Sequence, residues 1–349
     1  MYPIFTSIYI YYINIVDANN NLQQFNGAVK ISIVNKAVFW YYTCMSIILF
    51  YKYIPIQNPQ AIMHWQKELC TKLGLKGRII LATEGINATL GGAQPMVQEY
   101  IQAMNAHELF ADIDFKESSG NADYFPRLRI VVKKEIVRLD LDTDHYTAQT
   151  GGQLLEPHEA HELIKNNKNL LLLDGRNKYE SNIGTFTGAM RPPIENFREL
   201  PGYIDQNVDQ FKDKEVLMFC TGGIRCERAS SYLQSKGVAK KVYQIKGGIH
   251  RYIEQFPDGY FRGKNYVFDA RVAVPANDDI IGSCDICTTK ADDIINCINS
   301  FCNKQFIGCA PCVDQLGNTC SQACNTLVMT NAVPIRTKFK KMAYHANDY

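Results

Sequence analysis

Alternating apolar and polar positions divide residues 46–140 into short strands and helices. The predicted elements are a strand at 47–54, a helix at 59–73, two strands within 77–90, a helix at 95–104, and strands at 113–116 and 128–137. The helix at 59–73 is indicated by Ile62, Trp65 and Leu69, which recur at helical spacing. The first six of these elements follow the β-α-β-β-α-β order that is typical of a ferredoxin-like α+β domain.

A different pattern follows in residues 153–262, after a polar stretch at 141–152 that we interpret as a linker. Helices are expected at 157–166, at 225–236 and from about 250 onward, and strands at 170–174, 216–220 and 242–245. The runs LLLLD and VLMFC are almost wholly apolar, as strands of a buried parallel sheet are. We therefore expect an α/β domain with helices on both faces of its sheet.

The two ends of the chain differ from these domains. Residues 1–44 lack amphipathic periodicity, and Asn, Ile and Tyr supply 19 of the 44 positions. Met45 opens a natural first strand, so the segment before it is predicted to be a translated leader or a poorly ordered extension. Residues 263–330 are rich in cysteine and are expected to form a separate module, and residues 331–349 form a basic tail.

Length and charge narrow the classes of protein. A chain of 349 residues suggests two or three domains and can bury a substantial core, which excludes wholesale disorder. A formal net charge of +2 excludes a polycation but permits a local basic surface that binds phosphates. No run reaches the ~20 apolar residues of a membrane-spanning helix, and no secretory signal is recognisable. We therefore expect a cytoplasmic protein with no membrane partner.

A cysteine at the end of a buried strand carries the strongest local signal. The run VLMFCTGGIRCERA predicts a strand that ends at Cys220, a Gly-Gly loop and a helix. Backbone N–H groups of the loop and the helix N-terminus would surround the sulfur, which stabilises an anion and lowers a thiol pKa. The candidate loop residues are Thr221, Gly222, Gly223, Ile224 and Arg225. This arrangement favours a thiolate nucleophile or a persulfide on Cys220 over a merely structural cysteine.

The length of the loop distinguishes two chemistries. Four residues separate Cys220 from Arg225, whereas cysteine phosphatases close a longer loop around a phosphate. The shorter loop favours chemistry at a single sulfur atom. Cys226 is interpreted either as a residue that resolves an oxidised Cys220 or as a packing residue of the following helix.

This region resembles the rhodanese domain. The resemblance is carried by LLLLDGR, which contains Asp174 and Arg176, by CTGGIR at 220–225, and by VYQIKGGIH at 242–250. It implies that Cys220 bears a persulfide and that residues 221–225 form its cradle. Asp174 and Arg176 are then either supporting groups near the loop or a structural ion pair.

Further motifs extend the resemblance to most of the chain. They are FYKY at 50–53, GRIILATEGINATLGG at 77–92, CTGGIRCERA at 220–229, GGI at 247–249, GKNYVFDAR at 263–271, and the cysteines from 284 onward. In this order they resemble the rhodanese-domain tRNA uridine hydroxylases, which form 5-hydroxyuridine at the wobble position of tRNA. The resemblance covers residues 46–330.

The resemblance implies an oxidoreductase that hydroxylates uridine 34 at C5, with molecular oxygen as co-substrate and Cys220 essential. The sequence contains no legible nucleotide, haem, flavin or non-haem iron motif. Two hypotheses describe the role of Cys220 in the reaction. In the first it adds covalently to C6 of uridine and makes C5 nucleophilic, and in the second a persulfide on Cys220 takes part directly. The alternative functions are a persulfide sulfurtransferase that serves a small or protein acceptor, and a non-catalytic RNA-binding or zinc-stabilised interaction protein.

A tRNA substrate requires basic and aromatic residues on the way to Cys220. The segment at 127–138 contains five basic residues and one acidic residue on a strand pattern. The candidate RNA-binding residues are Lys76, Arg78, Arg127, Arg129, Lys133 and Lys134, each equally interpretable as part of a solvated strand face. Tyr124 and Phe125 are candidates for stacking on a base or for packing. The expected partner is the anticodon loop of tRNA, whose single-stranded bases can be splayed out.

Eight of the twelve cysteines fall within 41 residues. They are Cys284, Cys287, Cys297, Cys302, Cys309, Cys312, Cys320 and Cys324. Two C-x-x-C pairs in one short segment predict tetrahedral thiolate coordination, and eight thiolates suit two four-cysteine zinc sites. The spacing leaves sequential and interleaved ligand sets open, and free thiols or an iron–sulfur cluster are the alternatives. The module is expected to brace the rhodanese domain or to help hold RNA.

Overall fold

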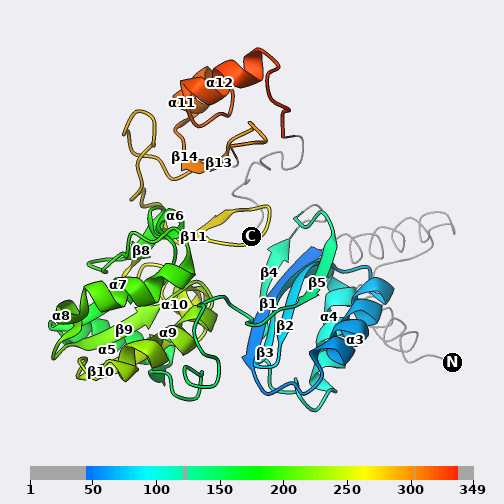
Figure 1. Cartoon of the computed structure of the whole chain (residues 1–349), viewed down its shortest axis with the longest axis vertical. Coiled ribbons are helices and arrows are strands. Elements are labelled where there is room, and N and C mark those ends of the chain that lie inside the picture. The colour runs from blue at the N-terminus through cyan, green and yellow to red at the C-terminus, as the bar shows by residue number, and fades with distance from the viewer. Residues whose placement is uncertain (1–44, 121–123, 303, 337–349) are drawn as a thin grey trace, which may run out of the picture. The chain divides into compact units, whose positions relative to one another are not determined.

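The computed structural model describes residues 45–120, 124–302 and 304–336 (Figure 1). The predicted leader at 1–44 and most of the basic tail lie outside the described residues. The chain divides into two units, residues 1–44 and residues 45–349. Every element described below belongs to the second unit.

The first domain is a five-stranded sheet with two helices. Its strands are β1 (Met45–Tyr53), β2 (Lys76–Ala82), β3 (Gly85–Ala93), β4 (Lys116–Gly120) and β5 (Leu128–Val132), in the order β4-β1-β3-β2-β5. Helices α3 (Pro59–Lys72) and α4 (Gln94–Asn105) lie on the same face of this sheet (Figure 1). Ile48, Phe50 and Tyr100 are fully buried in the core of this domain. The first four strands and both helices have the predicted ferredoxin-like order.

Two strands of this domain differ from the predicted ones. The fourth strand begins at Lys116, where the predicted strand ends. Ile113 and Phe115 pack against the core from a segment without regular structure, so their apolar character does not mark a strand. The strand predicted at 128–137 ends at Val132 and pairs in parallel with β2 as an additional edge strand.

The second domain is a parallel four-stranded sheet. Strands β6 (Gln153–Leu155), β7 (Leu170–Asp174), β9 (Glu215–Phe219) and β10 (Lys241–Ile245) have the order β6-β10-β9-β7. Its helices are α5 (Pro157–Asn166), α6 (Lys178–Ser181), α7 (Leu200–Gln206), α8 (Val208–Phe211), α9 (Ile224–Ser235) and α10 (Gly248–Gln255), with a 3-10 turn at Phe197–Glu199. Alternate residues of β9 enter two separate core clusters, Val216 and Met218 in one and Leu217 and Phe219 in the other. Both faces of the sheet are therefore covered, as the apolar runs predict.

Helix α9 fastens the segment between these two domains. The buried guanidinium of Arg228 pairs with the carboxylate of Glu135 and donates to the carbonyl oxygens of Tyr146 at 2.8 Å and Leu141 at 3.0 Å. A further carboxylate, that of Glu84 from the β2–β3 turn, lies 3.7 Å away. The stretch interpreted as a linker is thus bound to α9.

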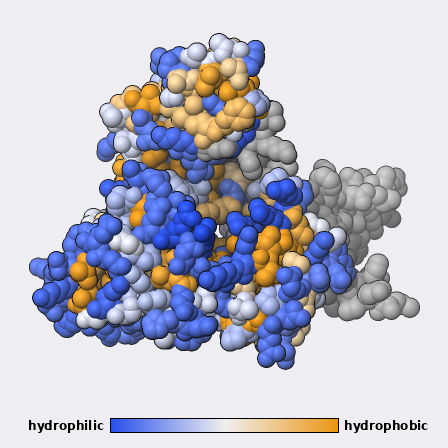
Figure 2. All heavy atoms as spheres, viewed as in Figure 1, coloured by the Kyte–Doolittle hydropathy of each residue, from blue (hydrophilic) through white to orange (hydrophobic). Residues whose placement is uncertain are grey.

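The remaining elements form two small sheets and the cysteine-rich module. Strands β8 (Gly184–Phe186), β11 (Phe261–Tyr266) and β12 (Ala273–Pro275) form a sheet in the order β12-β11-β8. The hairpin of β13 (Ile294–Asn296) and β14 (Gln305–Ile307) and the helices α11 (Ala310–Gln315) and α12 (Gln322–Met329) build the module. Figure 2 shows apolar surface over α11 and α12. Among the described residues, none of the helices has the length and apolar character that crossing a bilayer demands.

Candidate active site and metal sites

Cys220 follows β9 and lies inside a loop of backbone N–H groups. Its sulfur accepts a hydrogen bond from the N–H of Gly223 at 3.2 Å, and α9 begins at the next residue. The sulfur therefore lies at the positive end of a helix dipole. Burial by itself would raise the pKa of Cys220, but the hydrogen bonds of Cys226, the charge of Arg225 and the backbone N–H groups of both residues lower it to about 5. Cys220 is consequently a thiolate at neutral pH.

Two glycines allow the loop to close this tightly. Gly223 has a φ of +102°, and a Cβ there would lie 2.6 Å from the hydroxyl oxygen of Tyr51. Gly248 has a φ of +63°, and a Cβ there would lie 2.4 Å from the carbonyl oxygen of Cys220. The N–H of Ile249 donates to that same carbonyl oxygen at 2.9 Å. Any residue other than glycine at position 223 or 248 would therefore clash with these oxygen atoms and distort the loop.

Arg225 closes the loop and is held in place by Glu180 of α6. The guanidinium donates to the two carboxylate oxygens at 2.6 and 2.8 Å and to the Thr221 hydroxyl at 3.2 Å. The Thr221 hydroxyl in turn donates to Glu180 at 3.3 Å. All three residues are buried. Sequence reasoning missed Glu180, whose local signal is a helix capping box with Asn177 and not a catalytic motif.

Asp174 and Arg176 form a second buried ion pair in a different place. The guanidinium donates to both carboxylate oxygens at 2.8 and 2.7 Å and also to the carbonyl oxygen of Gly184. The hydroxyl of Thr185 donates to Asp174 at 2.8 Å. The pair therefore joins the end of β7 to β8, an arrangement that favours the structural interpretation of these two residues.

Cys226 lies directly behind the reactive sulfur. It is buried, and its thiol is hydrogen-bonded to Cys220. Burial, followed by that bond and the neighbouring thiolate, raises the pKa of Cys226 well above its ordinary value. Cys226 therefore stays protonated, and its S–H donates a hydrogen bond to the Cys220 sulfur. This bond further stabilises the Cys220 anion.

Strand β1 of the first domain covers the mouth of the loop. Tyr51 donates its hydroxyl hydrogen to Glu227 at 3.1 Å, and Tyr53 donates to the carbonyl oxygen of Ile224 at 3.1 Å. The side chain of Leu49 reaches to 3.2 Å from where a Cβ on Gly222 would lie. The site is thus built by both domains. Sequence reasoning missed these contacts, although β1 carries the FYKY motif and α9 the CERA motif.

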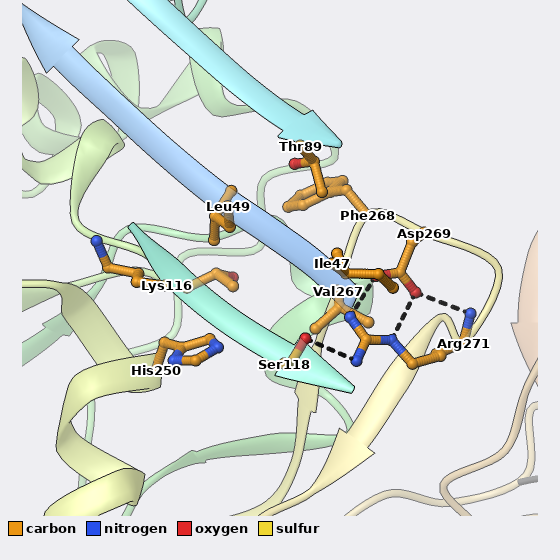
Figure 3. A pocket seen from close by; sticks show the side chains of 11 residues that line it. Ile47, Leu49, Thr89, Lys116, Ser118, His250, Val267, Phe268, Asp269 and Arg271 are labelled. Carbon is orange, nitrogen blue, oxygen red and sulfur yellow. Dashed lines mark hydrogen bonds and ion pairs between the residues drawn. The ribbon is translucent and has the colours of Figure 1, made fainter. Parts of the chain in front are cut away.

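A pocket opens beside the loop, between β1, β4 and the segment after β11 (Figure 3). Its lining consists of Ile47, Leu49, Thr89, Lys116, Ser118, Thr221, His250, Val267, Phe268, Asp269 and Arg271. Its enclosed volume is only about 30 Å³, so it is a shallow pocket that is open to solvent. Arg271 is paired with Asp269 and donates to Ser118 at 3.0 Å, which ties the GKNYVFDAR segment to β4. The half-exposed ring of Phe268 lies 5.8 Å from the Arg225 guanidinium.

The strand register aligns part of the predicted RNA-binding set with this pocket. Arg129 pairs with Arg78, Arg78 with Thr89, Thr89 with Leu49, and Leu49 with Lys116. Residues paired across neighbouring strands project from the same face of a sheet. This row therefore connects two exposed arginines at one edge of the sheet with three residues that line the pocket.

The other predicted RNA-binding residues lie around this row. Lys76 is exposed on β2, whereas Arg127, Lys133 and Lys134 are exposed beside the ends of β5. Of the two aromatic candidates, Phe125 is buried and packs against Gly91 of β3, which favours the packing interpretation. The ring of Tyr124 lies 5.4 Å from the Arg271 guanidinium.

The eight clustered cysteines form two interleaved groups. One group is Cys284, Cys287, Cys309 and Cys312, and the other is Cys297, Cys302, Cys320 and Cys324. Within each group the sulfur atoms all lie within 4.8 Å of one another, with distances of 3.5 Å between Cys287 and Cys309 and 3.6 Å between Cys302 and Cys320. Four thiolates around a zinc ion at ~2.3 Å would be about 3.8 Å apart. The residues present therefore fit two tetrahedral metal sites, and the structure selects the interleaved arrangement.

Comparison with known proteins places these features in one family. Successive parts of the chain match a UPF0176 acylphosphatase like domain at 45–136, a rhodanese-like domain at 156–255 and a rhodanase C-terminal domain at 262–325. A tRNA uridine(34) hydroxylase of Listeria welshimeri is 38% identical over 283 residues, which cover 80% of this chain and 88% of the relative. The chain belongs to the tRNA uridine(34) hydroxylase family. A hydroxylase of the same name from Pseudarthrobacter chlorophenolicus is 41% identical, with 76% of this chain and 93% of the relative covered.

The matched regions of this hydroxylase-family chain contain every group of the site. The first region contains β1, the second contains Cys220 and Glu227, and the third contains all eight clustered cysteines. The predicted family and the predicted α+β and α/β fold with a cysteine-rich module are therefore confirmed. Among solved structures, a rhodanese-like domain from Anabaena is 20% identical, covers 32% of this chain and 78% of its own, and has a TM-score of 0.27.

Proposed function

We propose that this chain converts uridine 34 of tRNA to 5-hydroxyuridine, with Cys220 as its reactive group. The observation that carries the proposal is the position of Cys220 in its loop. Its sulfur accepts a hydrogen bond from the N–H of Gly223, and Thr221, the residue after Cys220, lines a pocket that two domains build. The curated relatives of the chain are named tRNA uridine(34) hydroxylases.

The reaction replaces the hydrogen at C5 by a hydroxyl group. With molecular oxygen as co-substrate, one oxygen atom enters the base and the other leaves as water, which takes two electrons from an external reductant. This is the reaction class of a monooxygenase. Cys220 either adds to C6, which makes C5 nucleophilic, or carries a persulfide. Both routes use an anion on Cys220, and the loop stabilises such an anion.

The row of paired residues across the first sheet is proposed to guide the RNA. Within the part of the chain that the structure describes, no carboxylate forms an ion pair with Arg78 or Arg129. Partial desolvation of the guanidinium and the neighbouring Arg129 lower the pKa of Arg78. Its positive charge is therefore available to pair with an RNA phosphate. A wobble base lies in a single-stranded loop and can be splayed into the pocket, where the ring of Phe268 offers a stacking surface.

The two four-cysteine groups are proposed to hold zinc ions with a structural role. The first group shares its core cluster with Ile183 and Tyr266, and Tyr179 packs against that cluster. Tyr179 and Ile183 flank Glu180, which orients Arg225. A zinc ion in the first group would therefore brace the part of the rhodanese domain that supports the cysteine loop.

A rhodanese-type sulfurtransferase is the alternative that these observations disfavour. The Cys220 side chain is fully buried, so either a sulfur donor or a base must reach it through the adjoining pocket. The curated relatives, which match this chain over both domains and the cysteine-rich module, are named tRNA uridine(34) hydroxylases and favour the base.

The test is nucleoside mass spectrometry of tRNA from cells that lack this gene and carry one of three versions of it. We expect wild type to restore 5-hydroxyuridine and Cys220→Ser to fail. Cys70→Ala is the matched control, because Cys70 is buried in the core of the first domain and should not affect the modification. Failure of wild type to restore 5-hydroxyuridine would refute the proposal. Strong thiosulfate–cyanide turnover by the purified chain would favour the sulfurtransferase.

A further inference from the structure

Glu227 carries a partly buried carboxyl group beside the cysteine loop, and its surroundings differ from those of the buried acids. Asp174, Glu180 and Glu135 each form an ion pair with an arginine. For Glu227, the described residues place no lysine, arginine or histidine within ion-pair distance. Ionisation of a carboxyl group in such a position is energetically costly. Titratable groups with perturbed pKa values are concentrated at functional sites.

The hydroxyl of Tyr51 lies between this carboxyl group and the loop. It donates to one oxygen of Glu227 at 3.1 Å, and the side-chain nitrogen of Gln244 lies 3.5 Å from the other oxygen. The Tyr51 oxygen would also be 2.6 Å from a Cβ on Gly223, the residue whose N–H binds the Cys220 sulfur. Tyr51 is therefore in contact with both the acid and the loop.

The charged and titratable groups that face Glu227 come from four directions. They are Tyr51 and Tyr53 of β1, Lys116 of β4, Cys220 at the end of β9, and the neutral Gln244 of β10. Burial and then the Cys220 thiolate raise the pKa of Glu227, whereas the hydrogen bonds from Tyr51 and Gln244 and the charge of Lys116 lower it. The net pKa is about 7. Burial, followed by the charge of Glu227, keeps the pKa of Tyr51 well above its ordinary value.

These groups have separate roles at neutral pH. Cys220 is an anion, Tyr51 is protonated, and Glu227 exchanges between its two forms. Tyr51 and Glu227 thus have well-separated pKa values. Pairs of titratable groups with separated pKa values are typical of sites that use acid–base catalysis.

We propose that Glu227 and Tyr51 form the proton-exchanging pair of this site, with Glu227 holding the proton and Tyr51 passing it to and from C5 of the bound uracil ring. The inference rests on the proposed function and on the addition of Cys220 to C6. When the S–C6 bond forms, the π electron pair of the ring moves to C5. C5 takes the hydroxyl proton of Tyr51, and the phenol oxygen takes the carboxyl proton of Glu227. In the return step Tyr51 passes its hydroxyl proton back to the Glu227 carboxylate and takes a proton from C5. The electron pair of that C5–H bond restores the C5–C6 double bond, the S–C6 bond breaks, and its electron pair returns to sulfur.

This exchange needs neither oxygen nor a reductant, so it can be measured apart from hydroxylation. The full-length protein is incubated without oxygen with a tRNA transcript that carries tritium at uridine C5, and release of tritium to water is followed. We expect wild type to release tritium and Cys220→Ser to release none. Glu227→Gln and Tyr51→Phe should lower the maximal rate about a hundredfold, within the usual range for loss of a general acid or base, with KM changed less than about threefold.

The pH profile separates proton exchange from a structural role. The wild-type rate should show an inflection near pH 7, and Glu227→Gln should lose it. Tyr51→Phe should move it upward, because the lost hydrogen bond no longer stabilises the carboxylate. Tyr53→Phe is the matched control: it removes a neighbouring hydroxyl of the same strand that binds a carbonyl oxygen, and the inflection should stay.

Three results would overturn the inference. They are a wild-type pH profile in Glu227→Gln, unchanged tritium release in both Glu227→Gln and Tyr51→Phe, and absence of release from wild type while cells still form 5-hydroxyuridine. The last result would leave the proposed function standing. Absence of 5-hydroxyuridine in cells that carry wild type would instead refute the proposed function. Thermal unfolding shows whether each variant is folded. If either Glu227→Gln or Tyr51→Phe fails to fold, the rate and pH profile of the other variant test the inference.

Discussion

The chain uses cysteine in two regions that solve the same problem differently. At Cys220 one thiolate is stabilised by the N–H of Gly223, by the start of α9 and by the nearby charge of Arg225. In the module from 284 to 324, eight sulfur atoms lie in two groups of four at tetrahedral spacing. Hydrogen bonds and one nearby positive charge suffice for a single anion, whereas four thiolates at such distances repel one another unless a cation lies between them.

The comparison explains why one region is reactive and the other is suited to structure. The Cys220 anion keeps its lone pairs, because hydrogen bonds stabilise a thiolate without consuming it as a nucleophile. A zinc-bound thiolate would have its charge neutralised and its position fixed from four sides. Substitution of a cysteine in one region should therefore leave the other region unchanged, except where the two are in contact.

The largest effect is expected from Cys220→Ser. The serine hydroxyl stays protonated in the same loop, so hydroxylation of tRNA should fall by at least about a thousandfold, as for other nucleophiles that are removed. Metal content, measured by mass spectrometry of the purified chain, should remain at two equivalents. A loss of metal in this variant would contradict the independence of the two regions.

The reverse experiment separates the two metal groups. Cys312→Ser and Cys324→Ser each remove one ligand, and each should lower the metal content by about one equivalent. Cys312 belongs to the cluster that contains Ile183 and contacts Tyr179, which lie on either side of Glu180 in the chain. This variant should therefore also lower activity, by about tenfold, through displacement of Glu180 and of the Arg225 that it holds.

Within the described residues, Cys324 packs against the small cluster of Ile295, Cys297 and Phe306 in the module. Its variant should retain activity within about twofold of wild type, since the loop is not displaced. Equal loss of activity in both variants would show that the module acts as a whole, for example by holding RNA, and not through α6.

Much of this architecture follows from local sequence, and the exceptions have physical causes. The apolar run before Cys220 predicts a buried strand, and the glycines after it predict the cradle. The strand predicted at 113–116 is wrong because Ile113 and Phe115 fill the core from an irregular segment, and burial alone imposes no backbone conformation. The division of the eight cysteines depends on how the β13–β14 hairpin brings distant pairs together, which spacing does not determine.

The site itself is less visible in the sequence than its reactive atom. Tyr51 and Glu227 meet across 176 positions of the chain, and the contact exists only because β1 covers the loop. Both residues lie in motifs that signal the family, but a motif does not assign a role. Glu180 gives no signal beyond its helix cap, since its task depends on the tertiary position of Arg225.

The pH dependence of stability offers a further test of the Cys220 region. The folded-state pKa of about 5 lies below that of an ordinary thiol, so the unfolded chain binds more protons between these values. The stabilisation is therefore fully present above about pH 9 and is lost as pH falls toward 5, by at most about 1.4 kcal/mol per pH unit.

Chemical denaturation of wild type and Cys220→Ser measures this contribution as a difference. The advantage of wild type should grow from pH 5 to pH 9. The titration of groups that do not interact with Cys220 cancels, because both chains share them. A difference that stays constant with pH would mean that Cys220 is not held as an anion, and its chemistry would then resemble that of an ordinary buried thiol.

The smallest effects concern RNA affinity, and they decide whether the module contributes to it. Arg78→Gln should weaken tRNA binding about fivefold and reduce the slope of log affinity against log salt by about one, as expected when one phosphate contact is lost. Lys133→Gln is the matched control from the end of β5, outside the paired row, and should change affinity less than twofold.

Neither substitution should alter the metal content, and Cys324→Ser should leave the affinity for tRNA unchanged if the module only braces the rhodanese domain. Filter binding across a salt series measures all three variants on the same tRNA. An equal loss in Arg78→Gln and Lys133→Gln would indicate a diffuse basic surface. A loss in Cys324→Ser with wild-type behaviour of Arg78→Gln would move the RNA contact to the module and break the division of labour between the two cysteine regions.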